Sequence, residues 1–252
     1  MNACETSARP AVERVAGDLA THITAALQPG MRLPSEAQLA QQYGVSRVTL
    51  REAIRLLAGR GLVAVARGRR ATVTEPSGAV FGTFLAAAMR QDAKGVFDLV
   101  EIRLALEVQS ATLAARHVNR AGAQAIATAL QGMRDAPEHE PDDDAFHDAD
   151  LRFHEALALA SGNRMLSYML EALAIPCRRS FQLSLRGHAL LGLPRQRTIA
   201  AHERILQAVQ AGDPRAAAAA MRDHLRDAER GLRAVFSAGP LPASEPARQA
   251  TG

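Results

Sequence analysis

Apolar residues recur every three or four positions through most of this chain, a spacing typical of amphipathic helices. Within residues 61–74 the pattern changes to alternation, which predicts a β-hairpin with strands at 62–66 and 71–74. Beyond a Pro-Ser-Gly break at 76–78 the helical spacing returns and persists. The helices predicted on this basis lie at 10–27, at two short stretches within 33–57, and at 80–91, 95–117, 120–134, 143–160, 163–185, 194–211 and 214–236.

These elements predict a mainly α protein with two domains. Residues 10–76 would form three helices and a two-stranded hairpin, and residues 80–236 an all-helical antiparallel bundle. The ends, 1–9 and 237–252, are expected to be disordered, the second because it is rich in Pro, Ala and Ser.

The two short helices within 33–57 have the pattern of a helix-turn-helix. Ser35 and Ser46 are N-cap candidates for the first and the second helix, and Gly44 between them can adopt the positive φ of a tight turn. Leu50 and Ile54 begin the apolar face by which the second helix would pack. The alternative is an ordinary surface helical hairpin.

The opposite face of the second helix carries Arg47, Thr49 and Arg51. Arginine can pair with guanine edges or hold phosphates, and hydroxyl groups can contact either, so this face predicts entry into the major groove of DNA. The following hairpin places Gly68 between Arg67 and Arg69 at its tip, which suggests a wing that contacts phosphates or the minor groove. Basic hairpin tips can also be merely solvated.

The distribution of charge supports this assignment. The formal net charge is +4, and residues 1–76 carry all of it, with ten arginines against six acidic residues. The remainder has twenty basic and twenty acidic residues and is neutral. A positive excess confined to one domain is what phosphate contacts require.

The segment PGMRLPSEAQLAQQYGVSRVTLREAIRLLAGRGLV resembles the DNA-binding domain of the GntR family of bacterial transcription regulators. The resemblance implies a winged helix-turn-helix and maps the family's DNA contacts onto Arg47, Thr49 and Arg51 and its wing glycine onto Gly68. We add Ser35, Ser46, Arg67 and Arg69 to this predicted surface. The chain departs from the family at Ala37, where other members often carry a DNA-contacting arginine.

Four residues of the second domain could hold a metal ion. Asp150 and His154 are four positions apart and share a helix face, and His202 and His224 lie beside apolar residues on the last two helices. Three imidazoles and a carboxylate suit Zn²⁺, Ni²⁺ or Mn²⁺, with positions left for water or a bound acid. Alternatively, each histidine is a hydrogen-bonded core residue.

These four residues, with the segments DLRFH, SGN and AHERI, resemble the FCD effector domain found in one branch of the GntR family. The resemblance implies a helical bundle that binds a divalent metal at these positions. It also implies that Arg103 contacts the carboxylate of an effector, and the alternative for Arg103 is an intrahelical pair with Glu107. Asn163 is the second effector-binding candidate, and a helix cap is its alternative role.

Other features add little. His188 falls in a predicted loop at 187–192. His147 lies three residues before Asp150 and could contact the edge of the site, but we expect it to be exposed. The longest nearly apolar run, 79–89, is too short to cross a membrane, and the two cysteines suggest a reducing compartment, so the protein is expected to be cytoplasmic.

The sequence therefore predicts a transcription regulator, most simply a repressor, that binds a palindromic operator as a homodimer and responds to a small organic acid. One alternative is a metal-free domain that senses an acyl thioester or another larger ligand. Another is a metalloenzyme fused to a DNA-binding module, which we disfavour because no separate general base or nucleophile stands out.

Overall fold

The computed structural model describes residues 3–89, 94–137 and 144–238, and for residues 3–9 and 79 it describes only the backbone. The chain divides into two compact units, Met1–Val80 and Phe81–Gly252, which we call the N-terminal and the C-terminal unit. The division falls just beyond the predicted Pro-Ser-Gly break. No helix of the described part has the length and apolar character needed to cross a membrane.

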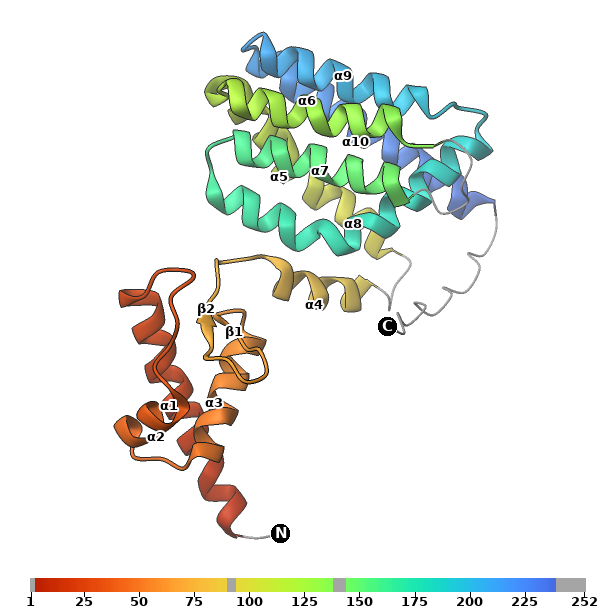
Figure 1. Cartoon of the computed structure of the whole chain (residues 1–252). Helices are drawn as coiled ribbons and strands as arrows, with labels where there is room; N and C mark the ends of the chain where they lie inside the picture. The colour runs from red at the N-terminus through yellow and green to blue at the C-terminus, as the bar shows by residue number, and fades with distance from the viewer. Residues whose placement is uncertain (1–2, 90–93, 138–143, 239–252) are drawn as a thin grey trace. The chain divides into compact units, whose positions relative to one another are not determined.

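The N-terminal unit consists of three helices and a small hairpin (Figure 1). Helix α1 spans Ala3–Ala26, α2 spans Glu36–Tyr43 and α3 spans Arg47–Gly59, and strands β1 and β2 span Val63–Ala64 and Thr72–Val73. Residues 3–9, which we expected to be disordered, are thus helical. The apolar faces predicted for α1 and α3 form the core, which includes Val15, Leu19, Leu50 and Leu57.

The turn between α2 and α3 has the expected geometry. Gly44 adopts φ +63° and its N–H bonds to the carbonyls of Ala40 and Gln41. The Ser46 side chain accepts a hydrogen bond from the N–H of Thr49 at 3.0 Å and so caps α3. Only glycine adopts such a positive φ without strain, so the turn depends on Gly44.

The wing is shorter than predicted. Its strands contain two residues each, with Val63 opposite Val73 and Ala64 opposite Thr72, whereas alternation predicted four or five. The chain before α2 contributes to the hairpin instead, because the N–H of Leu33 donates to the carbonyl of Ala71 at 2.8 Å. Hydrophobic alternation cannot reveal this third segment, since only tertiary structure brings it alongside β2.

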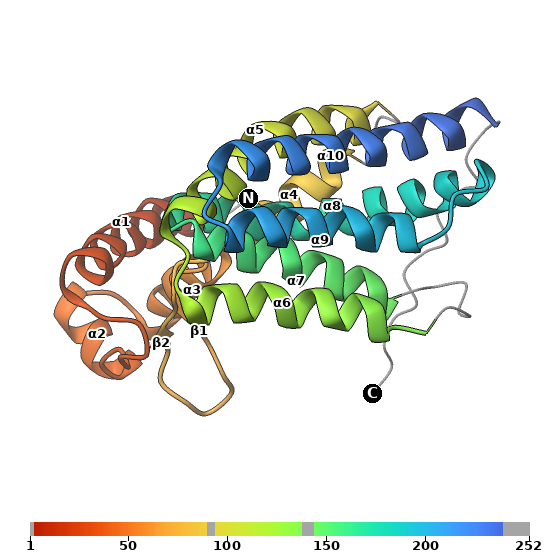
Figure 2. The same ribbon diagram turned by 90° about the horizontal axis from the view of Figure 1, so that it is seen from above.

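The C-terminal unit consists of helices that run side by side in a bundle (Figures 1 and 2). The observed bounds agree with the predicted ones to within a few residues at most ends: α4 Ala79–Met89, α5 Gly95–His117, α6 Arg120–Asp135, α7 Asp144–Ala160, α8 Arg164–Leu190, α9 Gln196–Gln210 and α10 Pro214–Ser237. Helix α10 packs against α5, α8 and α9, and α7 packs against α5, α6 and α8. Asp213 caps the start of α10, since its side chain accepts from the N–H groups of Arg215 and Ala216.

Helix α8 is longer than predicted and crosses α10 very closely. A Cβ atom on Gly187 would lie 1.8 Å from the carbonyl oxygen of Gly231, so the two backbones touch at this crossing. Glycine at 187 was interpreted as the start of a loop, but the tertiary contact retains it inside the helix. The crossing carries His188, the next residue, into the core, where it is 5% exposed.

Candidate functional site

The N-terminal unit exposes the predicted DNA-binding residues. Arg47 at the start of α3 and the wing residues Arg67, Gly68 and Arg69 are exposed, and Gly68 adopts φ +72°. These guanidinium groups are exposed to water and not buried in the protein, so they are accessible to phosphates and base edges.

Four of the predicted DNA contacts have structural partners within the unit. The Ser35 and Ser46 side chains cap α2 and α3. Nε of Arg51 lies 2.6 Å from Oε2 of Glu36, so the two residues form an ion pair. The terminal nitrogens of the Arg51 guanidinium do not take part in this contact. Thr49 is half-buried, and its hydroxyl lies 2.8 Å from that of Ser46.

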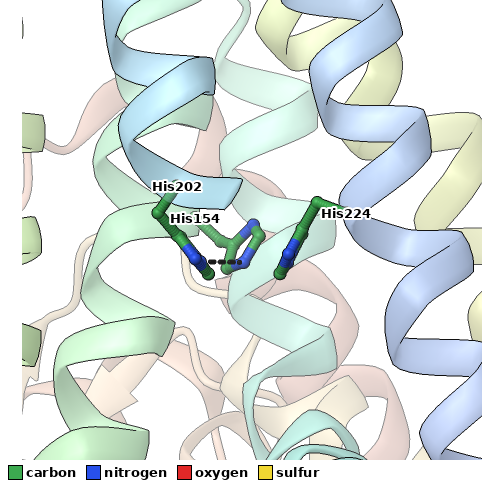
Figure 3. Close-up of side chains that lie close together, drawn as sticks. All are labelled: His154, His202 and His224. Carbon is green, nitrogen blue, oxygen red and sulfur yellow. Dashed lines mark hydrogen bonds between the residues drawn. The ribbon is translucent and has the colours of Figure 1, made fainter. Parts of the chain in front are cut away.

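In the C-terminal unit, His154 of α7, His202 of α9 and His224 of α10 converge (Figure 3). Each offers one ring nitrogen, and these three atoms lie within 4.8 Å of one another. Asp150, one turn before His154, places Oδ1 3.1 Å from Nε2 of His202. All four residues are buried, and Asp150 contacts two of the three histidines, since its Oδ2 also lies 3.8 Å from Nε2 of His154.

Backbone and carboxylate contacts determine which ring nitrogens face the cluster. Nδ1 of His202 donates to the carbonyl of Thr198 at 2.8 Å. In the neutral ring, Nε2 of His202 is therefore unprotonated and carries a lone pair. Nδ1 of His154 lies 2.5 Å from Oε2 of Glu107, close but poorly aligned for a hydrogen bond, and its Nε2 also faces inward. Such partners commonly orient metal-binding histidines.

The inward atoms fit a divalent cation. The two Nε2 atoms of His154 and His202 lie 3.3 Å apart, and lone pairs at this distance repel unless a proton or a metal ion lies between them. Donor atoms about 2.0–2.1 Å from one metal ion lie roughly 3.0–3.4 Å from each other, which matches both this separation and the Asp150 contact. Nε2 of His224 is buried without a hydrogen-bond partner, as expected for a further ligand.

Electrostatics favour the ligand forms of these groups. Burial raises the pKa of Asp150, but the interactions with His202, His154 and Arg103 together outweigh this effect and lower the pKa to about 2. Burial and the neighbouring His202 and His154 hold the pKa of His224 well below its usual value. A carboxylate and a neutral imidazole are the forms that bind metals.

Arg103 lies beside this cluster and is 1% exposed. Its Nε donates to Oε1 of Glu107 at 2.6 Å, and its guanidinium carbon lies 4.4 Å from the ring centre of Phe181. Burial raises the pKa of Glu107, but the charges of Arg103 and His154 outweigh this effect and lower it. The intrahelical pair considered from sequence is therefore present, and Arg103 also lines a cavity next to the cluster.

That cavity has a volume of about 30 Å³ and is enclosed mainly by side chains of the bundle. The sequence placed His188 in a loop and favoured exposure of His147 over a contact at the edge of the site, so this cavity was not predicted. Both are buried and line it. The helical spacing of Cys177, Phe181 and His188 on one face of α8 was the available signal.

Asn163 lies elsewhere. It is exposed, its side chain caps α8 by accepting from the N–H of Met165 at 3.0 Å, and it is not among the residues that line the cavity. The structure thus shows Asn163 in the role of a helix cap, which was the alternative to an effector contact in the sequence.

Comparisons with known proteins agree with the division of the chain into an N-terminal and a C-terminal unit. The description "Bacterial regulatory proteins, gntR family" fits residues 11–73, and "FCD domain" fits residues 98–227. The chain belongs to the GntR family. It is similar to the HTH-type transcriptional regulator LutR of Bacillus subtilis (strain 168), at 33% identity over 83% of this chain and 95% of that protein.

Other relatives extend the comparison. The Glc operon transcriptional activator of Escherichia coli (strain K12) is 30% identical over 89% of both chains. A solved structure, Streptococcus agalactiae GntR, is 27% identical, covers 87% of this chain and 99% of its own, and superposes with a TM-score of 0.66. This GntR-family chain is thus a DNA-binding transcription regulator with an effector-binding FCD domain, and its relatives carry the names of regulators rather than enzymes.

Proposed function

We propose that this regulator either dissociates from its operator or changes its arrangement on it when a small organic acid binds next to a divalent metal ion in the C-terminal unit. The observation that carries the proposal is the convergence of three buried histidine nitrogens, with the Asp150 carboxylate 3.1 Å from Nε2 of His202. The carbonyl of Thr198 sets the tautomer of His202, and Glu107 lies against Nδ1 of His154. Arg103 lines the adjacent cavity and would attract a carboxylate.

The residues of the chain would divide the work. Asp150, His154, His202 and His224 would hold Zn²⁺, Ni²⁺ or Mn²⁺, which supplies a Lewis-acidic position for a carboxylate oxygen. Arg103 would orient the acid, while Glu107 keeps both Arg103 and His154 in place.

The size of the cavity supports a small ligand. A cavity needs about 10–15 Å³ to hold one water molecule, so a volume of about 30 Å³ accommodates two water molecules or a few atoms of an acid. An acyl thioester would need a far larger opening between the helices. The rival of a metal-free domain is further disfavoured because all four ligand positions are filled by residues that bind metals.

Ligand binding can change DNA affinity only if the acid prefers one arrangement of the bundle over another. The wall of the site comes from α5, α7, α8, α9 and α10, so a bound acid contacts helices that pack on one another. We propose that their shift alters the spacing of two recognition helices in a homodimer, because a single winged helix covers too little DNA for useful specificity. Repression by operator occupancy is the simplest use of such a device.

The test is operator affinity measured with and without acid. An operator would be selected from random DNA with the purified protein, and binding would be followed while acids of two to four carbons are titrated into metal-loaded and metal-stripped protein. The proposal expects a change in operator affinity of about fivefold or more, the usual range of allosteric coupling, in the metal-loaded protein alone. An acid that binds without changing operator affinity would refute the switch.

The dimer has its own test. Sedimentation of the free protein and of its operator complex would give two chains per palindromic operator. A stable complex with one chain per operator would contradict the proposed homodimer and leave the acid response to be explained within one chain.

A further inference from the structure

An open cleft lies between α9 and α10, two helices that pack against each other, and its volume is about 840 Å³. Positive charge predominates among the residues that line it, in a unit that is neutral overall. We call it the arginine cleft. Its charged residues are Arg197, Arg204, Arg226, Arg230, Arg233, Asp223, Asp227 and Glu229.

The arginine cleft and the buried cavity share part of their walls. Asp227 and His224 line both of them, so these two residues of α10 separate the cavity from the open cleft. His224 points toward the histidine cluster (Figure 3), and in the proposed function a metal ion holds it there. Asp227 is therefore the part of the wall that can move.

Contacts on two sides hold Asp227 in the wall. Its backbone carbonyl accepts a hydrogen bond from Nε2 of His188, which lines the cavity, at 3.0 Å. Its carboxylate accepts from Nε of Arg197 at 3.0 Å and also from the guanidinium of Arg230. Arg230 belongs to α10, as Asp227 does, whereas Arg197 lies in the first turn of α9. The pair of Asp227 and Arg197 thus connects α9 to α10 across the wall.

This connection can break without leaving an unpaired charge in the wall. The Arg197 side chain is 44% exposed, so water can replace its contact with Asp227. Arg230 remains beside the Asp227 carboxylate when Arg197 leaves, because both residues are on α10. The desolvated carboxylate therefore keeps a counter-charge, which lowers the free energy of the opened arrangement.

Arg204 and Arg226 differ from the arginines that hold Asp227. Both are exposed, and within the described part of the chain neither side chain has an ion-pair or hydrogen-bond partner. A cleft lined by an excess of one charge concentrates ions of the opposite charge and accelerates their association. These two residues are therefore available to attract anions to the wall that Asp227 closes.

We propose that the arginine cleft is the entrance to the buried site and that the pair of Asp227 and Arg197 is its latch. Anions collect at Arg204 and Arg226 and pass Asp227 when the pair opens. Enclosed sites exchange their ligands through such opening motions. The inference rests on the proposed function, because it needs a metal ion in the buried site.

The experiment follows the removal of zinc from the full chain loaded with Zn²⁺, since this rate reports entry to the site without an identified effector. Two planar chelators serve as probes: dipicolinate, which is a dianion, and phenanthroline, which is neutral. In the unaltered protein the rate with dipicolinate should fall about fivefold from low to physiological salt concentration, because salt screens the arginines. The rate with phenanthroline should not change.

A double variant tests the attraction of anions. Arg204→Gln/Arg226→Gln should slow zinc removal by dipicolinate about fivefold and leave removal by phenanthroline unchanged. Arg120→Gln/Arg164→Gln is the matched control, because it removes two exposed arginines that do not line the cleft, and it should change neither rate. All variants should bind zinc at the stoichiometry of the unaltered protein.

A second pair of variants tests the latch. Arg197→Gln disconnects Asp227 from α9 and should accelerate zinc removal by phenanthroline about two- to fivefold, the range expected from the loss of one partly exposed ion pair. Arg230→Gln removes the same charge from the cleft but keeps the pair of Asp227 and Arg197. It should leave the phenanthroline rate unchanged.

The possible failures are distinguishable. Rates that depend neither on the charge of the chelator nor on Arg204 and Arg226 would overturn the entrance. Equal phenanthroline rates in Arg197→Gln and the unaltered protein would overturn the latch, while the metal site stands. A chain that binds no zinc would refute the proposed function together with this inference.

Discussion

Arg47 in the N-terminal unit and Arg103 in the C-terminal unit are the same residue type in opposite environments. Arg47 is exposed at the start of the recognition helix, whereas Arg103 is 1% exposed and is held by Glu107 and Phe181. An exposed guanidinium keeps its hydration until DNA replaces it, so a bare basic surface is stable by itself. A buried guanidinium needs a permanent counter-charge, because only such an interaction offsets the unfavourable free energy of its desolvation.

The comparison teaches how one chain separates two kinds of recognition. The N-terminal unit carries the whole net positive charge of the chain and can attract DNA at long range. The C-terminal unit is neutral overall and holds a few of its charges in a small buried site, where Arg103, Glu107 and Asp150 each have a specific partner. Changes at the two places should therefore affect different measurements.

The largest expected effect is the loss of metal from the buried site. In the double variant His202→Ala/His224→Ala, elemental mass spectrometry should find almost no divalent metal, against about one per chain in the unaltered protein, because two of four ligands are gone. Operator affinity in the absence of acid should remain.

Exposed His22 supplies the control, since His22→Ala should leave the metal content unchanged. Full metal content in the double variant would show that the cluster is not the metal site. Absence of metal in the unaltered protein, even after incubation with Zn²⁺, Ni²⁺ and Mn²⁺, would redirect the search to metal-free ligands.

The next effect is on stability. Glu107→Gln removes the charge that neutralises buried Arg103, so the free energy of unfolding of the metal-free protein should fall by about 3–5 kcal/mol. Glu203→Gln breaks the exposed pair with Arg134 and should cost about 0–1 kcal/mol. Urea unfolding followed by circular dichroism measures the free energy of unfolding of both variants. Equal losses in Glu107→Gln and Glu203→Gln would contradict the proposed difference between the buried and the exposed ion pair.

A third effect concerns operator binding. Arg47→Ala should weaken operator affinity by about 1–3 kcal/mol if the side chain contacts a base edge, without changing metal content. Arg204→Ala, an exposed arginine of α9, is the matched control and should leave DNA affinity unchanged. An unchanged affinity in Arg47→Ala would remove this residue from the recognition surface.

The smallest effect should come from the wing. Arg67→Ala and Arg69→Ala should each reduce the slope of log affinity against log salt concentration by about one, because each would remove one phosphate contact. The change should be similar for specific and nonspecific DNA. A loss confined to the selected operator would instead indicate that the wing contacts bases.

The sequence by itself determined the two-part organisation, the helix-turn-helix and most helix boundaries. These features depend on local periodicity and caps, such as Gly44 and Asp213, whose conformational effects act within a few residues. Spacing and resemblance also identified Asp150, His154, His202 and His224, because each pair or residue lay on an apolar helical face.

Tertiary structure alone decided what surrounds those four residues. The contact between Gly187 and Gly231 keeps α8 helical past its expected end, and it brings His188 to the wall of the cavity that Arg103 also lines. Residues 33 and 71, far apart in sequence, join at the wing for a similar reason. Local patterns set which face of a helix is apolar, whereas close approach of two backbones depends on both partners at once, and no single stretch of sequence records it.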